Sequence, residues 1–277
     1  MPAIDSTPGR RPPRATTVVA GAAVVLLALA GCGTDTSDTE ASGTARGSKS
    51  PAAGASPDSG DGSRAAKAAA LVHRAMDATF DQEYLSSTRR TKTEGTTTLR
   101  IAPGGDRTAC KAQSRKGSAS LDFIVTESAL YSRGSKEALE LSPEGKADPV
   151  RVQVMADRWV KRGAAVSEAA GDMCEATTRR TWLEERIPSL GRLAEEKPRQ
   201  QSMKVQERSA TKITYERAGG PLEFYIAAEG SPLLLRVTYP ATDLDESFSD
   251  FGKPFRVVAP SAAVSESQMA REVLAAQ

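Results

Sequence analysis

The segment LEFYIAAEGSPLLLRVTYP, residues 222–240, carries the clearest structural signal of the chain. Its first part alternates apolar and polar side chains and places Leu222, Phe224 and Ile226 on one side. A period of two residues is typical of a β-strand with one buried face. A second strand follows after Glu229-Gly230, where glycine supplies the backbone freedom of a tight turn. The segment therefore predicts two neighbouring strands of a sheet.

The same period appears on both sides of this segment. Downstream of the middle of the chain, strands are expected in MKVQER (203–208), TKITYER (211–217) and ESFSDFGKPFRVVAP (246–260), with turns at Ser209-Ala210, Gly219-Gly220 and Gly252. Nearer the start, TTTLRI (96–101), ASLDFIV (119–125) and SALYSRG (128–134) predict an antiparallel meander, with turns at 103–106 and at Lys116-Gly117. Cys110 lies on the second strand of this meander.

Helices are expected before and between the strands. Apolar residues at three- and four-residue spacing predict an amphipathic helix from Arg64 to about Tyr84, capped by Ser63. Further elements are a short helix at 149–157, a strand at 158–161, a helix at 173–187 ended by Pro188, a helical turn or loop at 190–197, and a short helix from Ser265. About seven to ten strands with inserted helices indicate an α+β fold with one large curved antiparallel sheet.

The first residues have the pattern of an export signal. Three arginines precede an uncharged run from Ala15 to Ala30, which is short for a membrane-spanning helix. The run ends in LALAGC, and Leu29 to Cys32 resembles a lipobox, which predicts a lipoprotein signal peptide at 1–31 and lipidation of Cys32. The alternative is an incidental thiol beside an ordinary cleavage site. Arg10-Arg11 leaves both the general and the twin-arginine export routes open.

Residues 33–63 are rich in Gly, Ser, Thr, Ala, Pro and Asp and contain no large apolar side chain. Such a segment buries too little surface to offset the entropy of ordering it. The sequence therefore predicts a lipidated tether at 32–63, with a root-mean-square reach of roughly 30 Å. Acyl chains such as palmitate on Cys32 would hold the chain to the extracytoplasmic face of the cell membrane.

The charge balance argues against a nucleic-acid partner. The signal segment contains three arginines and one aspartate, so the 37 basic and 35 acidic residues become 34 of each in the mature chain. Nucleic-acid-binding proteins usually carry a basic excess on one face. Besides Cys32, only Cys110 and Cys174 remain, and outside the cytoplasm two such cysteines are expected to form a disulfide. Two buried free thiols are the alternative.

The motifs of common enzymes are missing from the sequence. His73 is the only histidine, and no Gly-x-Ser-x-Gly segment or P-loop is present. A metal site would lack a second histidine ligand, and the two remaining cysteines are expected to be committed to a disulfide. Paired acids such as Glu184-Glu185 fit a solvated helix face. We therefore expect no catalytic residues, no metal, no cofactor and no enzymatic activity.

Several segments together resemble the actinobacterial lipoproteins of the LppX/LprG type, which share a LolA-like fold. These segments are the lipobox at Cys32, ALYSRGSKEAL with DRWVKRG, DMCEA, and the ending AAEGSPLLLRVTY with SFSDFGKPFRVVAP. The resemblance covers nearly all of residues 64–260 and implies a half-open barrel at 64–277, with helices covering its concave face. It also supports pairing of Cys110 with Cys174.

In this group the concave face holds acyl chains, which implies a lipid or other acylated ligand. The candidate apolar positions are Leu99, Ile101, Phe123, Val125, Leu222, Phe224 and Ile226, and each of them could equally be core. No charged clamp for a headgroup is evident in the sequence. The alternative function is a non-catalytic interaction or sensor module of the cell envelope without a ligand. The sequence leaves the ligand's identity and the oligomeric state open.

Overall fold

The computed structural model describes residues 59–277, except for 106, 143–145, 147 and 188. All described residues belong to one compact unit within residues 54–277. The predicted signal peptide, Cys32 and the predicted tether up to residue 58 lie outside the described residues.

One mixed sheet of twelve strands forms the centre of the described unit, in the order β12-β6-β5-β4-β3-β2-β1-β11-β10-β9-β8-β7. Its strands are β1 (Leu85–Thr91), β2 (Gly95–Pro103), β3 (Thr108–Lys116), β4 (Ala119–Val125), β5 (Leu130–Gly134), β6 (Val160–Lys161), β7 (Arg199–Val205), β8 (Arg208–Tyr215), β9 (Leu222–Ala227), β10 (Leu234–Tyr239), β11 (Leu244–Ser249) and β12 (Val264–Ser265). Only the pairing of β12 with β6 is parallel. The edge strands β7 and β12 do not pair with each other, so the sheet stays open.

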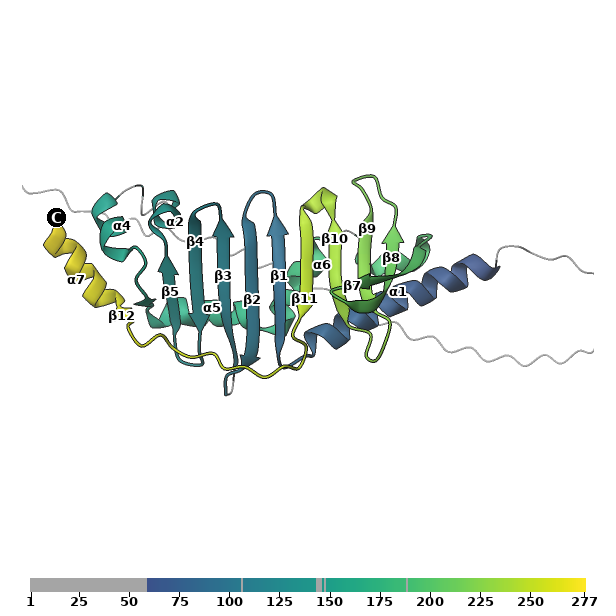
Figure 1. The fold of residues 1–277 in the computed structure, drawn as a ribbon, viewed down its shortest axis with the longest axis horizontal. Helices are drawn as coiled ribbons and strands as arrows, with labels where there is room; N and C mark the ends of the chain where they lie inside the picture. The colour runs from purple at the N-terminus through teal and green to yellow at the C-terminus, as the bar shows by residue number, and fades with distance from the viewer. Residues whose placement is uncertain (1–58, 106, 143–145, 147, 188) are drawn as a thin grey trace, which may run out of the picture. The chain divides into compact units, whose positions relative to one another are not determined.

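The strand count exceeds the predicted seven to ten mainly because β1 and the two-residue strand β12 were not predicted; the two-residue β6 lies within the strand predicted at 158–161. β1 has the polar sequence LSSTRRT and lies in the middle of the sheet, where it joins the two meanders by pairing with β2 and β11 (Figure 1). Because β11, a strand distant in sequence, pairs with β1 and holds it in the sheet, β1 forms without an alternating apolar pattern of its own.

The predicted turn at Ser209-Ala210 is wrong, because both residues belong to β8. Ala210 pairs with Met203 on β7 and with Ala227 on β9. The turn lies three residues earlier, at Gln206 and Glu207, whose φ values are 52° and 62°. Positive φ at two consecutive residues is typical of the type I′ turn, whose twist matches that of the two strands it joins in a hairpin.

The helices differ from the predictions mainly at their boundaries. They are α1 (Ser59–Phe80), α2 (Lys136–Leu141), α4 (Pro149–Met155), α5 (Ala164–Gly171), α6 (Ala176–Glu185) and α7 (Glu266–Ala276), with 3₁₀ turns η1 (Asp172–Cys174), η2 (Leu190–Glu195) and η3 (Pro240–Thr242). α1 begins four residues before Ser63, which lies inside it. The predicted helix at 173–187 is divided at Glu175, where the backbone is extended. The short helix at 149–157, the helical turn at 190–197 and the helix after Ser265 are confirmed.

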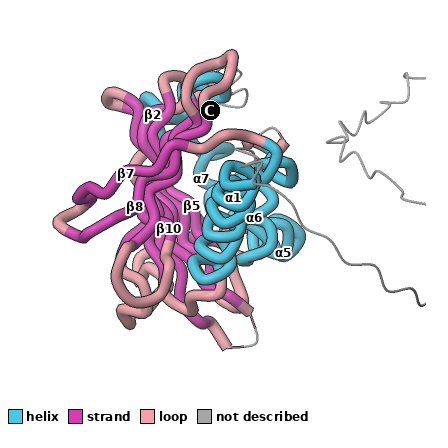
Figure 2. Tube along the Cα trace, turned by 90° about the vertical axis from the view of Figure 1, so that its right-hand side faces the viewer, coloured by secondary structure: helices cyan, strands magenta, loops and turns pink. Residues whose placement is uncertain are grey.

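The sheet curves, and α1, α5 and α6 lie along its concave side (Figure 2). The α1 side chains Val72, Met76 and Phe80 enter the core, and the Phe80 ring meets the Phe248 ring edge-on with centroids 5.8 Å apart. A buried Thr79 hydroxyl accepts a hydrogen bond of 2.8 Å from the amide of Leu234, where the pairing of β10 with β9 is irregular. The α+β class and the helix-covered concave face are thus as predicted.

The predicted disulfide is present between Cys110 and Cys174. The two Cα atoms are 5.6 Å apart and the bond closes a separation of 64 residues. Cys110 lies on β3 and Cys174 ends η1, so the bond ties the helical segment between β6 and β7 to the middle of one meander.

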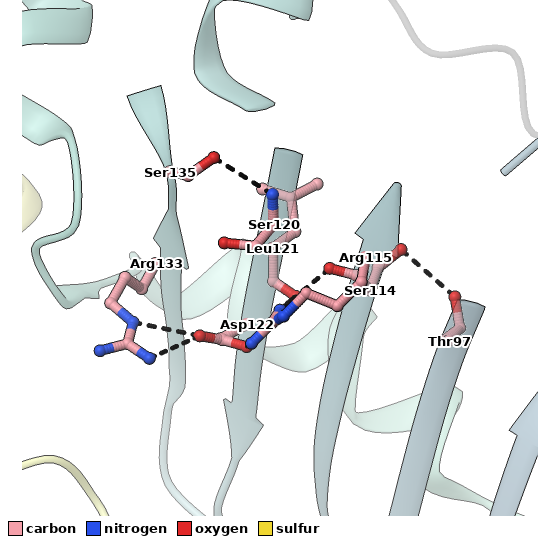
Figure 3. A network of polar contacts seen from close by, with 8 residues as sticks. All are labelled: Thr97, Ser114, Arg115, Ser120, Leu121, Asp122, Arg133 and Ser135. Atoms are coloured by element: carbon pink, nitrogen blue, oxygen red, sulfur yellow. Dashed lines mark hydrogen bonds and ion pairs between the residues drawn. The ribbon is translucent and has the colours of Figure 1, made fainter. Parts of the chain in front are cut away.

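The opposite face of the sheet carries ion pairs as well as a small second apolar cluster of Ala210, Tyr225, Ala227, Leu233 and Leu235. Asp122 on β4 receives contacts from Arg115 at 2.9 Å and Arg133 at 2.6 Å (Figure 3). Burial opposes ionisation of Asp122, but the hydrogen bonds from the two arginines prevail and hold its pKa below the usual value. On β9, Glu223 pairs with Lys212 at 2.5 Å. These charges explain why alternate positions of the strands are polar.

Candidate ligand-binding groove

The strand register aligns the predicted apolar positions in rows across the concave face. One row is Leu85, Ile101, Cys110, Val125 and Leu130, and all five are buried. The adjacent row contains Leu99, Ala112, Phe123, Ser132 and Val160. The prediction that Leu99 and Ile101 share one side of their strand, and Phe123 and Val125 one side of theirs, is therefore confirmed.

The other three candidate positions lie in solid core. Leu222, Phe224 and Ile226 are fully buried on β9, close to α1, and they line none of the cavities described below. The Phe224 ring packs edge-on against Tyr215, with centroids 6.2 Å apart. The concave face thus has two different ends, a packed one under α1 and a second one over β4 to β6.

Over β4 to β6 the structure has two adjoining cavities, which we call together the terminal groove. A cavity of about 200 Å³ lies between β4, β5, α2 and α4, and its apolar lining includes Leu121, Phe123, Leu139 and Val152. A cavity of about 480 Å³ lies between α4, β6 and α7. The two cavities share the lining residues Arg151, Met155, Val160 and Arg162.

Small residues in the strand rows explain why space remains here. Ser132 and Gly134 face the helices from β5, next to Phe123 and Leu121 on β4. A Cβ atom on Gly134 would come within 3.0 Å of the Leu139 side chain, so this glycine allows α2 to approach the sheet. The floor of the groove is therefore apolar but only partly filled.

Two capped helices form the walls. Asp148 caps α4 by accepting a 3.0 Å hydrogen bond from the Arg151 amide, with Pro149 at the first helical position. Ser265 caps α7 by accepting from the Gln268 amide at 3.1 Å. Met269 and Val273, four residues apart on α7, are buried against this end of the sheet, as expected for the apolar stripe of a helix.

Four arginines line the groove: Arg133, Arg151, Arg158 and Arg162. Arg133 pairs with Asp122 at 2.6 Å. Arg158 pairs with Glu272 at 2.6 Å and Arg162 pairs with Glu266 at 3.3 Å, both across to α7. Arg151 donates through Nε to the Met155 sulfur at 3.4 Å. Since the glutamate partners of Arg158 and Arg162 on α7 are more than one hundred residues away, local spacing could not indicate these ion pairs or the groove between α4 and α7.

Ile101 and Val125 border two further, more polar cavities near the disulfide. The one beside Ile101 has a volume of about 320 Å³ and includes Arg107, Glu175 and Arg179 in its lining, and the one beside Val125 has about 210 Å³. Burial lowers the pKa of Arg179 to about 10, although Glu246 and Glu175 act in the opposite direction. The polar lining gives both cavities little apolar surface for an acyl chain.

A buried ion pair anchors α6 next to these cavities. Burial raises the pKa of Glu246, while Arg89, 3.6 Å away, favours the charged form. The guanidinium groups of Arg89 and Arg186 both lie over the Trp182 ring, a favourable cation–π arrangement. These charged groups have partners within the fold, so we assign them to structure.

Two absences hold for the described part of the chain. None of its helices combines the length and apolar character needed to cross a bilayer. Its His, Cys, Asp and Glu side chains form no group of three or more that could hold a metal ion.

The fold and the groove define an α+β domain with one open, helix-covered sheet. No protein-family model matches the chain, and no curated protein does. Among solved structures the chain is similar to LprF from Mycobacterium bovis, with 11% identity, a TM-score of 0.44, and 70% of this chain and 97% of that chain covered.

Two further similarities are weaker. An uncharacterized conserved protein from Thermus thermophilus has 12% identity and a TM-score of 0.31, with 72% and 99% of the two chains covered. A chain of the MucA/MucB complex of Pseudomonas aeruginosa has 14% identity and a TM-score of 0.30, with 73% and 60% covered. We therefore describe the architecture of this chain from its own sheet order and helix placement.

Proposed function

We propose that this protein is a non-catalytic lipoprotein that binds an acylated molecule in the terminal groove. In this proposal Cys32 carries the lipid anchor and holds the domain at the extracytoplasmic face of the cell membrane. The sequence supports the anchor through the lipobox pattern, and the resemblance to the LppX/LprG group supports an acylated ligand.

The single observation that carries the proposal is the contrast between the two ends of the concave face. Under α1 the apolar positions of β9 are fully buried, whereas over β6 a cavity of about 480 Å³ remains between α4 and α7. Pockets for small molecules commonly have volumes of roughly 300–1,000 Å³. The cavity is therefore large enough for part of a single acyl chain.

Hydrophobic burial would supply the affinity. Each buried methylene contributes about 0.8 kcal/mol, so eight to ten methylenes would contribute roughly 6–8 kcal/mol before the costs of association. The apolar lining from Met155, Val160 and Met269 provides the surface for this burial. Partial extraction of a chain from a membrane becomes feasible on this scale.

The test uses residues 32–277 with Cys32→Ser, so that no attached acyl group competes for the groove. We expect organic extraction and mass spectrometry of the purified protein to yield a co-purifying acyl lipid, and a fluorescent twelve-carbon probe to bind. Met155→Trp should reduce probe binding at least tenfold, because Met155 lines both cavities.

Met203→Trp is the matched control, since Met203 lies on β7 at the opposite edge of the sheet. It should leave probe binding unchanged. Absence of both co-purified lipid and probe binding in the unmodified domain would overturn the proposal and leave the interaction-module alternative. Equal binding by the two tryptophan variants would overturn the assignment of the groove.

A further inference from the structure

We infer that the ligand is a single-chain amphiphile with an anionic end, and that Arg151 binds this end while the chain lies along α7. The inference rests on the proposed function and specifies the chemistry of its ligand. Arg151 is one of the residues shared by the two cavities of the terminal groove, so its position marks the junction between them.

Arg151 differs from the other three arginines of the groove in its partners. Arg133 pairs with Asp122 at 2.6 Å. Arg158 and Arg162 each have a glutamate partner on α7. For Arg151, no carboxylate of the described residues lies within ion-pair distance, and its Nε donates only to the Met155 sulfur. A thioether is a weak acceptor, and a guanidinium has five N–H donors, so most of the donor capacity of Arg151 is available to a ligand.

The surroundings of Arg151 favour an anion that carries an apolar chain. The side chain is half-buried beside Met155 and Val160, where a charge interaction is screened less than in open water. Planar guanidinium groups bind carboxylates and phosphates through paired hydrogen bonds. An anionic head at Arg151 would leave the cavity lined by Met269 and Val273 for the chain.

Two carboxylates border the groove, and both already have donors. Asp148 accepts from the Arg151 amide at 3.0 Å and from Gln277 at 3.5 Å. Glu266 accepts from the Gly163 amide at 2.8 Å in addition to its pair with Arg162. Glu266 is thus paired with Arg162, and Asp148 is held as the cap of α4. Arg151 is the groove arginine without a carboxylate partner among the described residues.

The experiment compares three twelve-carbon probes on residues 32–277 with Cys32→Ser: dodecanoate, dodecyl phosphate and dodecanol, measured by displacement of a fluorescent neutral probe. A hydrogen bond to a charged group is worth roughly tenfold or more in affinity. We expect at least one anion to bind about tenfold more tightly than dodecanol. The ranking of the two anions separates a fatty-acid carboxylate from a phosphate headgroup.

Arg151→Gln should remove this preference and leave the affinity for dodecanol unchanged, while Arg151→Lys should restore part of it. Arg192→Gln, at an exposed position of η2, is the control and should behave like the unmodified domain. Equal affinity for all three probes in the unmodified domain would overturn the inference while the proposed function stands. An anion preference that survives Arg151→Gln would equally overturn it, and binding of none of the three would overturn the proposed function itself.

Discussion

Reduction of the Cys110–Cys174 bond is expected to lower the free energy of unfolding by about 4 kcal/mol. The bond closes a separation of 64 residues, and the chain-entropy relation gives about 4.3 kcal/mol at 25 °C for a loop of this length. Typical domains are stable by only about 5–15 kcal/mol. A loss of this size would lower the melting temperature by roughly 8–16 °C in a domain of this size.

The structure makes reduction a clean perturbation. Both sulfur-bearing residues are buried, at 1% and 0% exposure, and a free thiol behaves as a small apolar group in a core. The reduced protein should therefore keep its packing and lose mainly the constraint on its unfolded chain. Because the bond is inaccessible in the folded state, reduction has to be carried out in denaturant and followed by refolding.

The assay is urea unfolding of residues 32–277 with Cys32→Ser, oxidised and reduced, followed by tryptophan fluorescence. Trp182 reports on α6 and Trp159 on the end of the sheet near β6. Cys110→Ala combined with Cys174→Ala should give the same shift plus the smaller cost of lost side-chain volume. Coincident unfolding curves for the oxidised and reduced forms, or two titratable thiols in the protein purified without reductant, would refute the reasoning.

Three further outcomes are expected. Leu183→Ala should cost about 2–5 kcal/mol of stability, because Leu183 is fully buried in the core, while Leu141→Ala at 65% exposure should change stability by less than about 0.5 kcal/mol in urea unfolding. Asp122→Asn should destabilise the domain by about 1–3 kcal/mol at pH 7. Since the folded pKa of Asp122 is lowered, its contribution to stability exists above the unfolded pKa of about 3.9 and is lost as the pH falls through the folded pKa. Below about pH 4 the stability of this variant should therefore change less with pH than that of the exposed control Asp172→Asn, and equal profiles would contradict the assignment. Cys32→Ser in the producing cell should leave the precursor uncleaved or release protein into the medium, and membrane fractionation with normal mature mass would contradict the lipobox prediction.

Local patterns determined much of this fold. The alternation in residues 222–226 correctly places Leu222, Phe224 and Ile226 on one face, because successive side chains of any strand point to opposite sides. The same reasoning holds for Phe123 and Val125 on β4. The helix after Ser265 follows from its cap, and the disulfide follows from the presence of two cysteines in a chain with a predicted export signal.

The sequence did not reveal β1 or the break at Glu175. β1 contains Ser86, Ser87, Arg89 and Arg90 and lacks the alternation of apolar and polar side chains that usually marks a strand. It is held by pairing with β11 about 160 residues later. At Glu175 the extended backbone follows a 3₁₀ turn that brings Cys174 to Cys110. In both cases partners distant in the chain override the local preference.

Which apolar positions are core and which border a groove was decided by tertiary structure alone. Phe123 and Phe224 both lie on alternating strands, yet Phe123 borders the terminal groove and Phe224 lies in the packed core. The difference arises because α1 packs closely on β9 and β10, whereas α4 and α7 meet over β6 through contacts such as Arg158 with Glu272, separated by 114 residues. Side-chain alternation depends on neighbouring residues and can be predicted from sequence, but the space left between a sheet and its helices depends on docking between distant segments and exists only in the folded chain.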